Sequence, residues 1–299
     1  MTERNKDKTI APIKPAENQM PGGVPPVSKP RQDNWKKQRL PKRLELIEGA
    51  HLIAPASTKG GIGKSSTIIE MAMICELLGI PYIVATFDAS NTTLQGSLGD
   101  DGKVVILDAR TPELARKSLS DLTVQAREAR ALILLDYPGA VDNKESSLLE
   151  NIRRARVLTR CESLQMIAPI TPDARELEGA YKAVQIFEPD SLLLRARRPT
   201  SHGPSFESFG QAWDVLKEFP VWECEHWLQA MKDVITRTGA YTHLPDVSKL
   251  PAYLNEKGKA LPEVEFLDVE DVVRYTEDAA KAVYHYLLKS ITTVPSDAA

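Results

Sequence analysis

A glycine-rich loop between an apolar strand and an apolar helix constrains this chain more than any other feature. The apolar run at residues 51–54 leads into the loop, and a mostly apolar stretch at 65–78 follows it and ends at Gly79. The loop sequence is Ser57-Thr58-Lys59-Gly60-Gly61-Ile62-Gly63-Lys64-Ser65-Ser66. The backbone N–H groups of such a loop, with the positive end of the following helix, bind phosphate groups. The sequence therefore predicts a phosphate-binding strand–loop–helix unit.

The end of this loop matches the nucleotide-binding pattern G-x-x-x-x-G-K-[ST], but its beginning does not. In that pattern the lysine neutralises the phosphates and the final hydroxyl holds Mg²⁺. Gly63, Lys64 and Ser65 fill the last three positions, whereas Thr58 stands in place of the first glycine. We therefore expect Lys64 to bind phosphate and Ser65 to be a metal ligand.

A second lysine before the paired glycines gives the loop the form K-G-G-x-G-K-[ST]-[ST]. In this form the loop resembles the deviant phosphate-binding loop of the ParA/MinD superfamily of ATPases. The resemblance implies that Lys59 reaches across a dimer to the partner's nucleotide, and so takes part in catalysis. The residues that it assigns to nucleotide binding are Lys59, Gly60, Gly61, Ile62, Gly63, Lys64, Ser65 and Ser66.

The rest of the chain alternates apolar runs with helical stretches. Strands are expected at 82–87, 104–107, 131–135, 164–170 and 191–194, and helices at 112–130, 144–160, 173–187 and 270–291. Strands separated by helices of this length predict an α/β fold, with a doubly wound, mostly parallel sheet flanked by helices. Ligands of such folds bind at the carboxyl ends of the strands.

Two acids follow expected strands at that edge. Asp136 ends the run at 131–135, where a carboxylate can orient Mg²⁺ through water. Its surroundings are similar to the superfamily's h-h-D-x-P-P segment, with Gly139 in place of the second proline. Asp88 stands at the second acid of the superfamily's D-x-D-P-Q-x-N segment, and Thr86 replaces the first. The resemblance implies that Asp88 positions the attacking water, so it is the second predicted catalytic residue.

A narrower resemblance concerns the segment from Asp88 to Gly96. It is similar to the D-P-x-N-x-T-[FL]-x-G segment of conjugal-transfer ATPases of the TraL/MobD type, and Ser205-Phe206-Glu207 is similar to their [KP]-S-F-E element. Where many relatives carry an adenine-reading asparagine, this chain has Arg195-Ala196-Arg197-Arg198. The three arginines are expected to face phosphate, DNA or solvent. ATP as the nucleotide therefore rests on resemblance alone.

Charge and proline set the N-terminus apart from the rest of the chain. Residues 1–43 hold eleven Lys or Arg against four acids, a net charge of +7, which leaves −10 for the remainder. They also hold seven of the 21 prolines. We expect a disordered basic arm over 1–45, an ATPase domain over 46–291 and a short tail over 292–299. The arm is either a DNA-binding element, with Trp35 as a stacking residue, or a solvated linker.

Several classes of protein are disfavoured by composition. The N-terminus is charged and lacks an apolar signal core, which favours a cytoplasmic protein, and no apolar stretch is long enough to span a membrane. The last helix carries mixed charges and no basic amphipathic extension, so a membrane anchor is not expected. The cysteines are scattered, which argues against disulfide, zinc or iron–sulfur chemistry. They are Cys75, Cys161 and Cys224.

With these features, the resemblance to ParA/MinD ATPases implies an ATP- and Mg²⁺-dependent dimerisation switch. The resemblance favours a role in plasmid partition or conjugative DNA transfer, with DNA and a DNA-bound adaptor or relaxase-type protein as partners. One alternative is a scaffold that binds its nucleotide without hydrolysing it. Another is an ATPase that positions a cell-surface machine and binds no DNA.

Overall fold

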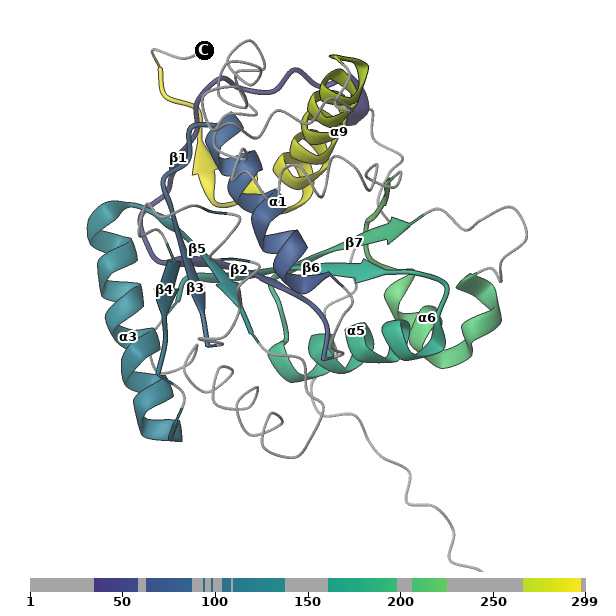
Figure 1. Cartoon of the computed structure of the whole chain (residues 1–299), viewed down its shortest axis with the longest axis horizontal. Coiled ribbons are helices and arrows are strands. Elements are labelled where there is room, and N and C mark those ends of the chain that lie inside the picture. The colour runs from purple at the N-terminus through teal and green to yellow at the C-terminus, as the bar shows by residue number, and fades with distance from the viewer. Residues whose placement is uncertain are drawn as a thin grey trace, which may run out of the picture.

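The computed structural model describes residues 35–58, 63–87, 94, 98, 104–108, 110–137, 161–197, 206–224 and 266–296. Its centre is a seven-stranded sheet in the order β4-β3-β5-β2-β6-β7-β8, and every pairing in that sheet is parallel (Figure 1). The strands are β2 (His51–Pro55), β3 (Tyr82–Thr86), β4 (Val104–Ile106), β5 (Leu132–Asp136), β6 (Ser163–Ile170), β7 (Ser191–Arg197) and β8 (Val221–Cys224). The predicted fold class is confirmed.

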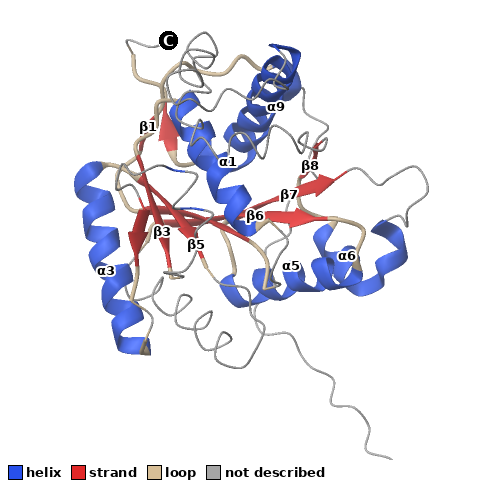
Figure 2. Ribbon diagram, in the orientation of Figure 1, coloured by secondary structure: helices blue, strands red, loops and turns tan. Residues whose placement is uncertain are grey.

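Helices cover both faces of this sheet (Figure 2). They are α1 (Lys64–Leu77), α3 (Pro112–Ala129), α5 (Ala174–Phe187), α6 (Gly210–Leu216) and α9 (Phe266–Val283), with short helices η1 (Trp35–Lys37), η2 (Phe206–Phe209) and η5 (Tyr284–Leu288). One hydrophobic core lies under α1, α9 and η5, and the other under α3, α5 and α6. Both faces of the sheet are therefore buried, as its long apolar runs require.

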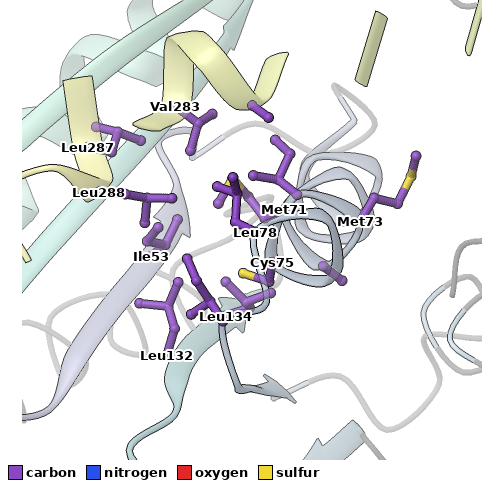
Figure 3. Close-up of a cluster of buried hydrophobic side chains, with 14 of the residues drawn as sticks. Ile53, Met71, Met73, Cys75, Leu78, Leu132, Leu134, Val283, Leu287 and Leu288 are labelled. Atoms are coloured by element: carbon purple, nitrogen blue, oxygen red, sulfur yellow. The ribbon is translucent and has the colours of Figure 1, made fainter. Parts of the chain in front are cut away.

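The strand β5 illustrates how the sequence produces these two cores. Leu132 and Leu134 pack in the core beneath α1, whereas Ile133 and Leu135 pack in the core on the opposite face. Figure 3 shows Leu132 and Leu134 close to Met71, Cys75 and Leu78 of the α1 region, with Val283, Leu287 and Leu288 of the C-terminal helices beyond them.

Capping residues define where the helices α3 and α5 begin. The Thr111 side chain accepts a hydrogen bond from the Leu114 N–H at 3.3 Å, and Pro112 is the first helical residue of α3. The Asp173 carboxylate accepts from the N–H groups of Arg175 and Glu176 at the start of α5. Both helices begin within two residues of the positions expected from sequence.

Most predicted elements are confirmed in the described part of the chain. The expected helix at 144–160 lies outside the described residues. The structure adds α6 and the edge strand β8, which sequence patterns missed because both are short. Trp222 of β8 is 4% exposed and belongs to the core that lies under α1 and α9.

The folded part extends past the boundaries expected at residues 45 and 292. Trp35 is buried and packs edge-on against Tyr286, with ring centroids 6.5 Å apart. Strand β1 (Glu45–Leu46) pairs antiparallel with β9 (Thr292–Thr293). Residues 35–46 are thus held by the C-terminal segment, and the predicted role of Trp35 as a base-stacking residue is wrong. Residues 1–34 lie outside the described residues.

Candidate nucleotide-binding site

The glycine-rich loop lies at the carboxyl end of the central strand β2, between β5 and β6. Gly63 caps α1 in the left-handed region, with φ of 91° and ψ of 27°, a conformation that favours glycine. The backbone N–H and the hydroxyl of Thr67 each donate a 2.9 Å hydrogen bond to the Gly63 carbonyl. The predicted turn from loop to helix is therefore present, and the positive end of α1 faces the loop.

Two predicted metal ligands meet beside this turn. The Ser65 hydroxyl donates a 2.7 Å hydrogen bond to Oδ2 of Asp136, the last residue of β5. Asp136 is 3% exposed and Lys64 is 7% exposed, so the charged groups of this site lie largely away from bulk water. Hydroxyl and carboxylate oxygens are the hard donors that Mg²⁺ prefers, and this pair fits that ion.

Of the other predicted site residues, only Ser66 belongs to the described part of the chain. Lys59, Gly60, Gly61, Ile62 and Asp88 lie outside the described residues, and their roles remain predictions. The strand that leads to Asp88 ends next to the site, because Thr86 of β3 is in register with Asp136 of β5. Ser66 is described, and it lies half-buried in the first turn of α1.

Tyr137, which sequence reasoning did not single out, joins β5 to the start of the loop. Its hydroxyl donates to the Pro55 carbonyl at the end of β2 and accepts from the Ser57 N–H at 3.3 Å. Burial raises the pKa of Tyr137, so the hydroxyl keeps its proton. A buried tyrosine needs a partner for its hydroxyl, and this rule is the signal that would have identified it. Tyr137 thus fixes the strand end that leads into the loop.

A second contact holds the loop against α5. The Thr58 N–H donates to the Gly179 carbonyl at 3.2 Å, and the Thr58 hydroxyl lies 3.5 Å from the same oxygen. Thr58 is the residue that replaces the first glycine of the standard loop pattern. Its side chain thus contributes to anchoring the loop on the neighbouring helix.

A buried ion pair joins α1 to β7, and a tyrosine of α9 is hydrogen-bonded to both of its members. Arg195 of β7 lies 3.2 Å from Glu70 of α1, and the Tyr275 hydroxyl of α9 donates to Glu70 at 2.7 Å. Arg195 also donates to that hydroxyl at 3.1 Å. Burial raises the pKa of Glu70, and the charge of Arg195 opposes this shift. Arg195 thus pairs with Glu70 rather than facing phosphate, DNA or solvent. The Arg197 side chain and Arg198 lie outside the described part of the chain.

Among residues 35–296 as far as they are described, no group of three or more His, Cys, Asp or Glu side chains forms a metal site. No helix in the described ranges is both long and apolar enough to cross a membrane.

Comparisons with known proteins give structural neighbours only. No protein-family model matches the sequence, and no curated protein matches it. The structure is similar to the MinC:MinD cell division protein complex of Aquifex aeolicus, with a TM-score of 0.48 and 13% identity over 72% of this chain and 99% of that chain.

Two further structures are similar at a comparable level. A ParA family ATPase from Chlorobium tepidum TLS has a TM-score of 0.47 and 13% identity, over 77% of this chain and 99% of that chain. FtsY from Mycoplasma mycoides has a TM-score of 0.43 and 17% identity, over 69% of this chain and 73% of that chain. At these identities and TM-scores, function has to be inferred from this chain's own residues.

Proposed function

We propose that this protein is a Mg²⁺-dependent ATPase that works as a nucleotide-controlled dimerisation switch. The observation that carries the proposal is the hydrogen bond between Ser65 and Asp136 beside the left-handed Gly63 and the buried Lys64. It brings a hydroxyl, a carboxylate and a lysine to the amino end of one helix at the carboxyl edge of a parallel sheet. That combination suits a metal-bound polyphosphate.

Phosphate binding follows from the first turn of α1. The first N–H groups of a helix have no partner within the helix and carry its partial positive charge. Lys64 adds a full positive charge at a position that is mostly screened from water, where electrostatic attraction is stronger than in bulk solvent. These groups would bind the β- and γ-phosphates of the nucleotide.

Ser65 and Asp136 would hold Mg²⁺, Ser65 directly and Asp136 through water. The ion would neutralise charge on the phosphate oxygens. Hydrolysis breaks the bond between the γ-phosphorus and the β–γ bridging oxygen while a water oxygen bonds to that phosphorus. We assign Asp88 to orienting this water and Lys59 to contacting the nucleotide of the partner subunit, both by resemblance to ParA/MinD ATPases. ATP as the nucleotide has the same basis.

The biological setting that we favour is plasmid partition or conjugative DNA transfer. The resemblance of the segment 88–96 to TraL/MobD-type ATPases supports transfer, and the positive charge of residues 1–43 supports a DNA partner. A DNA-bound adaptor or a relaxase-type protein would then receive the dimer. A scaffold that keeps its nucleotide, or an ATPase that positions a cell-surface machine, is the alternative.

The proposal is tested by nucleotide titration with Lys64→Ala. Loss of the buried charge should abolish binding of MgATP in a calorimetric titration. The matched control is Lys182→Ala, because Lys182 lies on the exposed side of α5, paired with Glu178. The control should bind like the wild type. Normal MgATP binding by Lys64→Ala would refute the site, whereas binding without turnover in the wild type would favour the scaffold.

A further inference from the structure

One short segment of the described chain is strongly cationic. Residues 36–43 hold five Lys or Arg and no acid, so they carry five of the seven net positive charges of residues 1–43. All five cations are exposed. They are Lys36, Lys37, Arg39, Lys42 and Arg43, and we call residues 36–43 the docked cationic segment.

Apolar residues fix this segment to the fold. Trp35 is 8% exposed, with its ring against Tyr286, and Lys36 Nζ lies 5.5 Å from the centroid of the Trp35 ring. Leu40 packs against the same core, and Leu44 is fully buried. The apolar side chains therefore point into the protein while the cations point outward. This arrangement presents a fixed positive surface rather than a free tail.

The segment lies at the far end of α1 from the phosphate-binding loop. The Leu44 N–H donates a 2.9 Å hydrogen bond to the carbonyl of Leu78, the residue that caps the carboxyl end of α1. Figure 1 shows this end of α1 beside β1 and the C-terminal elements, away from the end that begins at the loop. A helix of 14 residues is about 21 Å long at 1.5 Å per residue. An anion bound to the segment thus would not compete with nucleotide.

We infer that the docked cationic segment binds the phosphate backbone of DNA. This inference deepens the proposed function by naming the surface that meets DNA, and it rests on that function for the class of partner. Of the five cations, Arg43 has an ion pair with Glu45, at 3.4 Å and largely exposed; the other four have no ion pair among the described residues. Closely spaced, exposed cations without acids favour a polyanion, since each neutralised phosphate releases counterions.

A lipid surface fits this segment less well than DNA. Stable attachment to a bilayer needs apolar groups that enter it in addition to positive charge. Here the apolar residues of the segment and its flanks, Trp35, Leu40 and Leu44, are used to pack against the protein. DNA binding requires only the outward charges.

The test measures how DNA binding depends on salt concentration in two full-length variants that each lose four positive charges. The test variant replaces Lys36, Lys37, Arg39 and Lys42 with Gln and retains Trp35 and Arg43. The matched control replaces four exposed cations of the opposite helix layer with Gln. The control residues are Lys117, Arg175, Lys182 and Lys217. A third protein lacks residues 1–34 only.

For the test variant, we measure the slope of log K against log salt with a labelled DNA duplex. The magnitude of this negative slope should decrease by about 0.9 for each lost phosphate contact, and so by about 3.6 if all four cations make contact. The control variant should keep the wild-type slope, and the protein without residues 1–34 should keep most of it. The inference would be overturned by an unchanged slope in the test variant or by an equally flattened slope in the control variant. It would also be overturned if only the protein without residues 1–34 had a flattened slope.

Two further measurements separate the possible failures. In the first, the proteins are mixed with vesicles of anionic phospholipid. If the test variant lost vesicle binding but kept DNA binding, DNA would be overturned as the partner. MgATP affinity should be the same in all four proteins. A wild-type protein that fails to bind MgATP would refute the proposed function, whereas an unchanged salt slope with normal MgATP binding would refute only the inference.

Discussion

Breaking the buried ion pair between Arg195 and Glu70 should destabilise the protein strongly. The side chains are 14% and 4% exposed, with 3.2 Å between Arg195 Nε and Glu70 Oε2. Two unit charges at that separation attract by about 5 kcal/mol at an effective dielectric constant of 20. Burying each ion costs several kcal/mol, so the intact pair contributes little net stability, but either charge left alone keeps its full burial cost.

Arg195→Met should therefore lower the free energy of unfolding by about 3–5 kcal/mol, because it leaves the Glu70 carboxylate buried without its charge partner. Adding Glu70→Gln should restore part of this loss, since the uncompensated charge is then gone. The double variant should be less destabilised than the sum of the single variants, with a coupling of about 1–3 kcal/mol.

Urea unfolding measures these free energies, and an exposed ion pair supplies the control. Lys182→Met and Glu178→Gln alter a pair whose side chains are 56% and 57% exposed, and each change should cost less than about 1 kcal/mol. A loss of less than about 1 kcal/mol for Arg195→Met, or strict additivity in the double variant, would refute the reasoning.

The remaining predictions concern the site itself. Tyr137→Phe should raise the KM for MgATP while kcat changes little, because the Pro55 carbonyl and the Ser57 N–H lose the hydroxyl that fixes the start of the loop. An unchanged KM in steady-state kinetics would show that Tyr137 does not have this role. Asp88→Ala should abolish turnover and trap an ATP-bound dimer in sizing experiments, so wild-type turnover would exclude it from the mechanism. Asp136→Ala should instead weaken Mg²⁺-dependent nucleotide binding, and a titration that shows normal Mg²⁺ dependence would contradict this.

The sequence predicted the features that depend on local pattern. A continuous apolar run such as 131–135 has to be buried on both faces, and an acid at its end has to lie at the carboxyl edge of the sheet. Asp136 accordingly meets Ser65, although the two lie 71 positions apart in the chain. Gly63 could likewise be placed because it fills the second glycine position of the nucleotide-binding pattern, and it adopts a left-handed conformation that favours glycine.

Features that depend on contacts between distant elements were not predictable. Arg195 has a local sequence typical of a basic surface, and only the packing of α1, β7 and α9 shows that Glu70 neutralises its charge and that Tyr275 accepts its hydrogen bond. Trp35 lies in a proline-rich basic context, and its burial depends on Tyr286 at the other end of the chain. Deletion of residues 1–43 would remove this packing along with the charge, so the salt-slope test retains residues from Trp35 onward.

The central claim, that nucleotide controls dimerisation, is tested most directly by the mass of Lys59→Ala in solution. Light scattering coupled to size exclusion should give a monomer for the wild type without nucleotide and a dimer with MgATP. Lys59→Ala should bind MgATP and remain monomeric, because the proposed contact with the partner's nucleotide would be lost while Lys64 would still bind the phosphates. A Lys59→Ala protein that dimerises like the wild type, or a wild type whose mass does not respond to MgATP, would contradict the account.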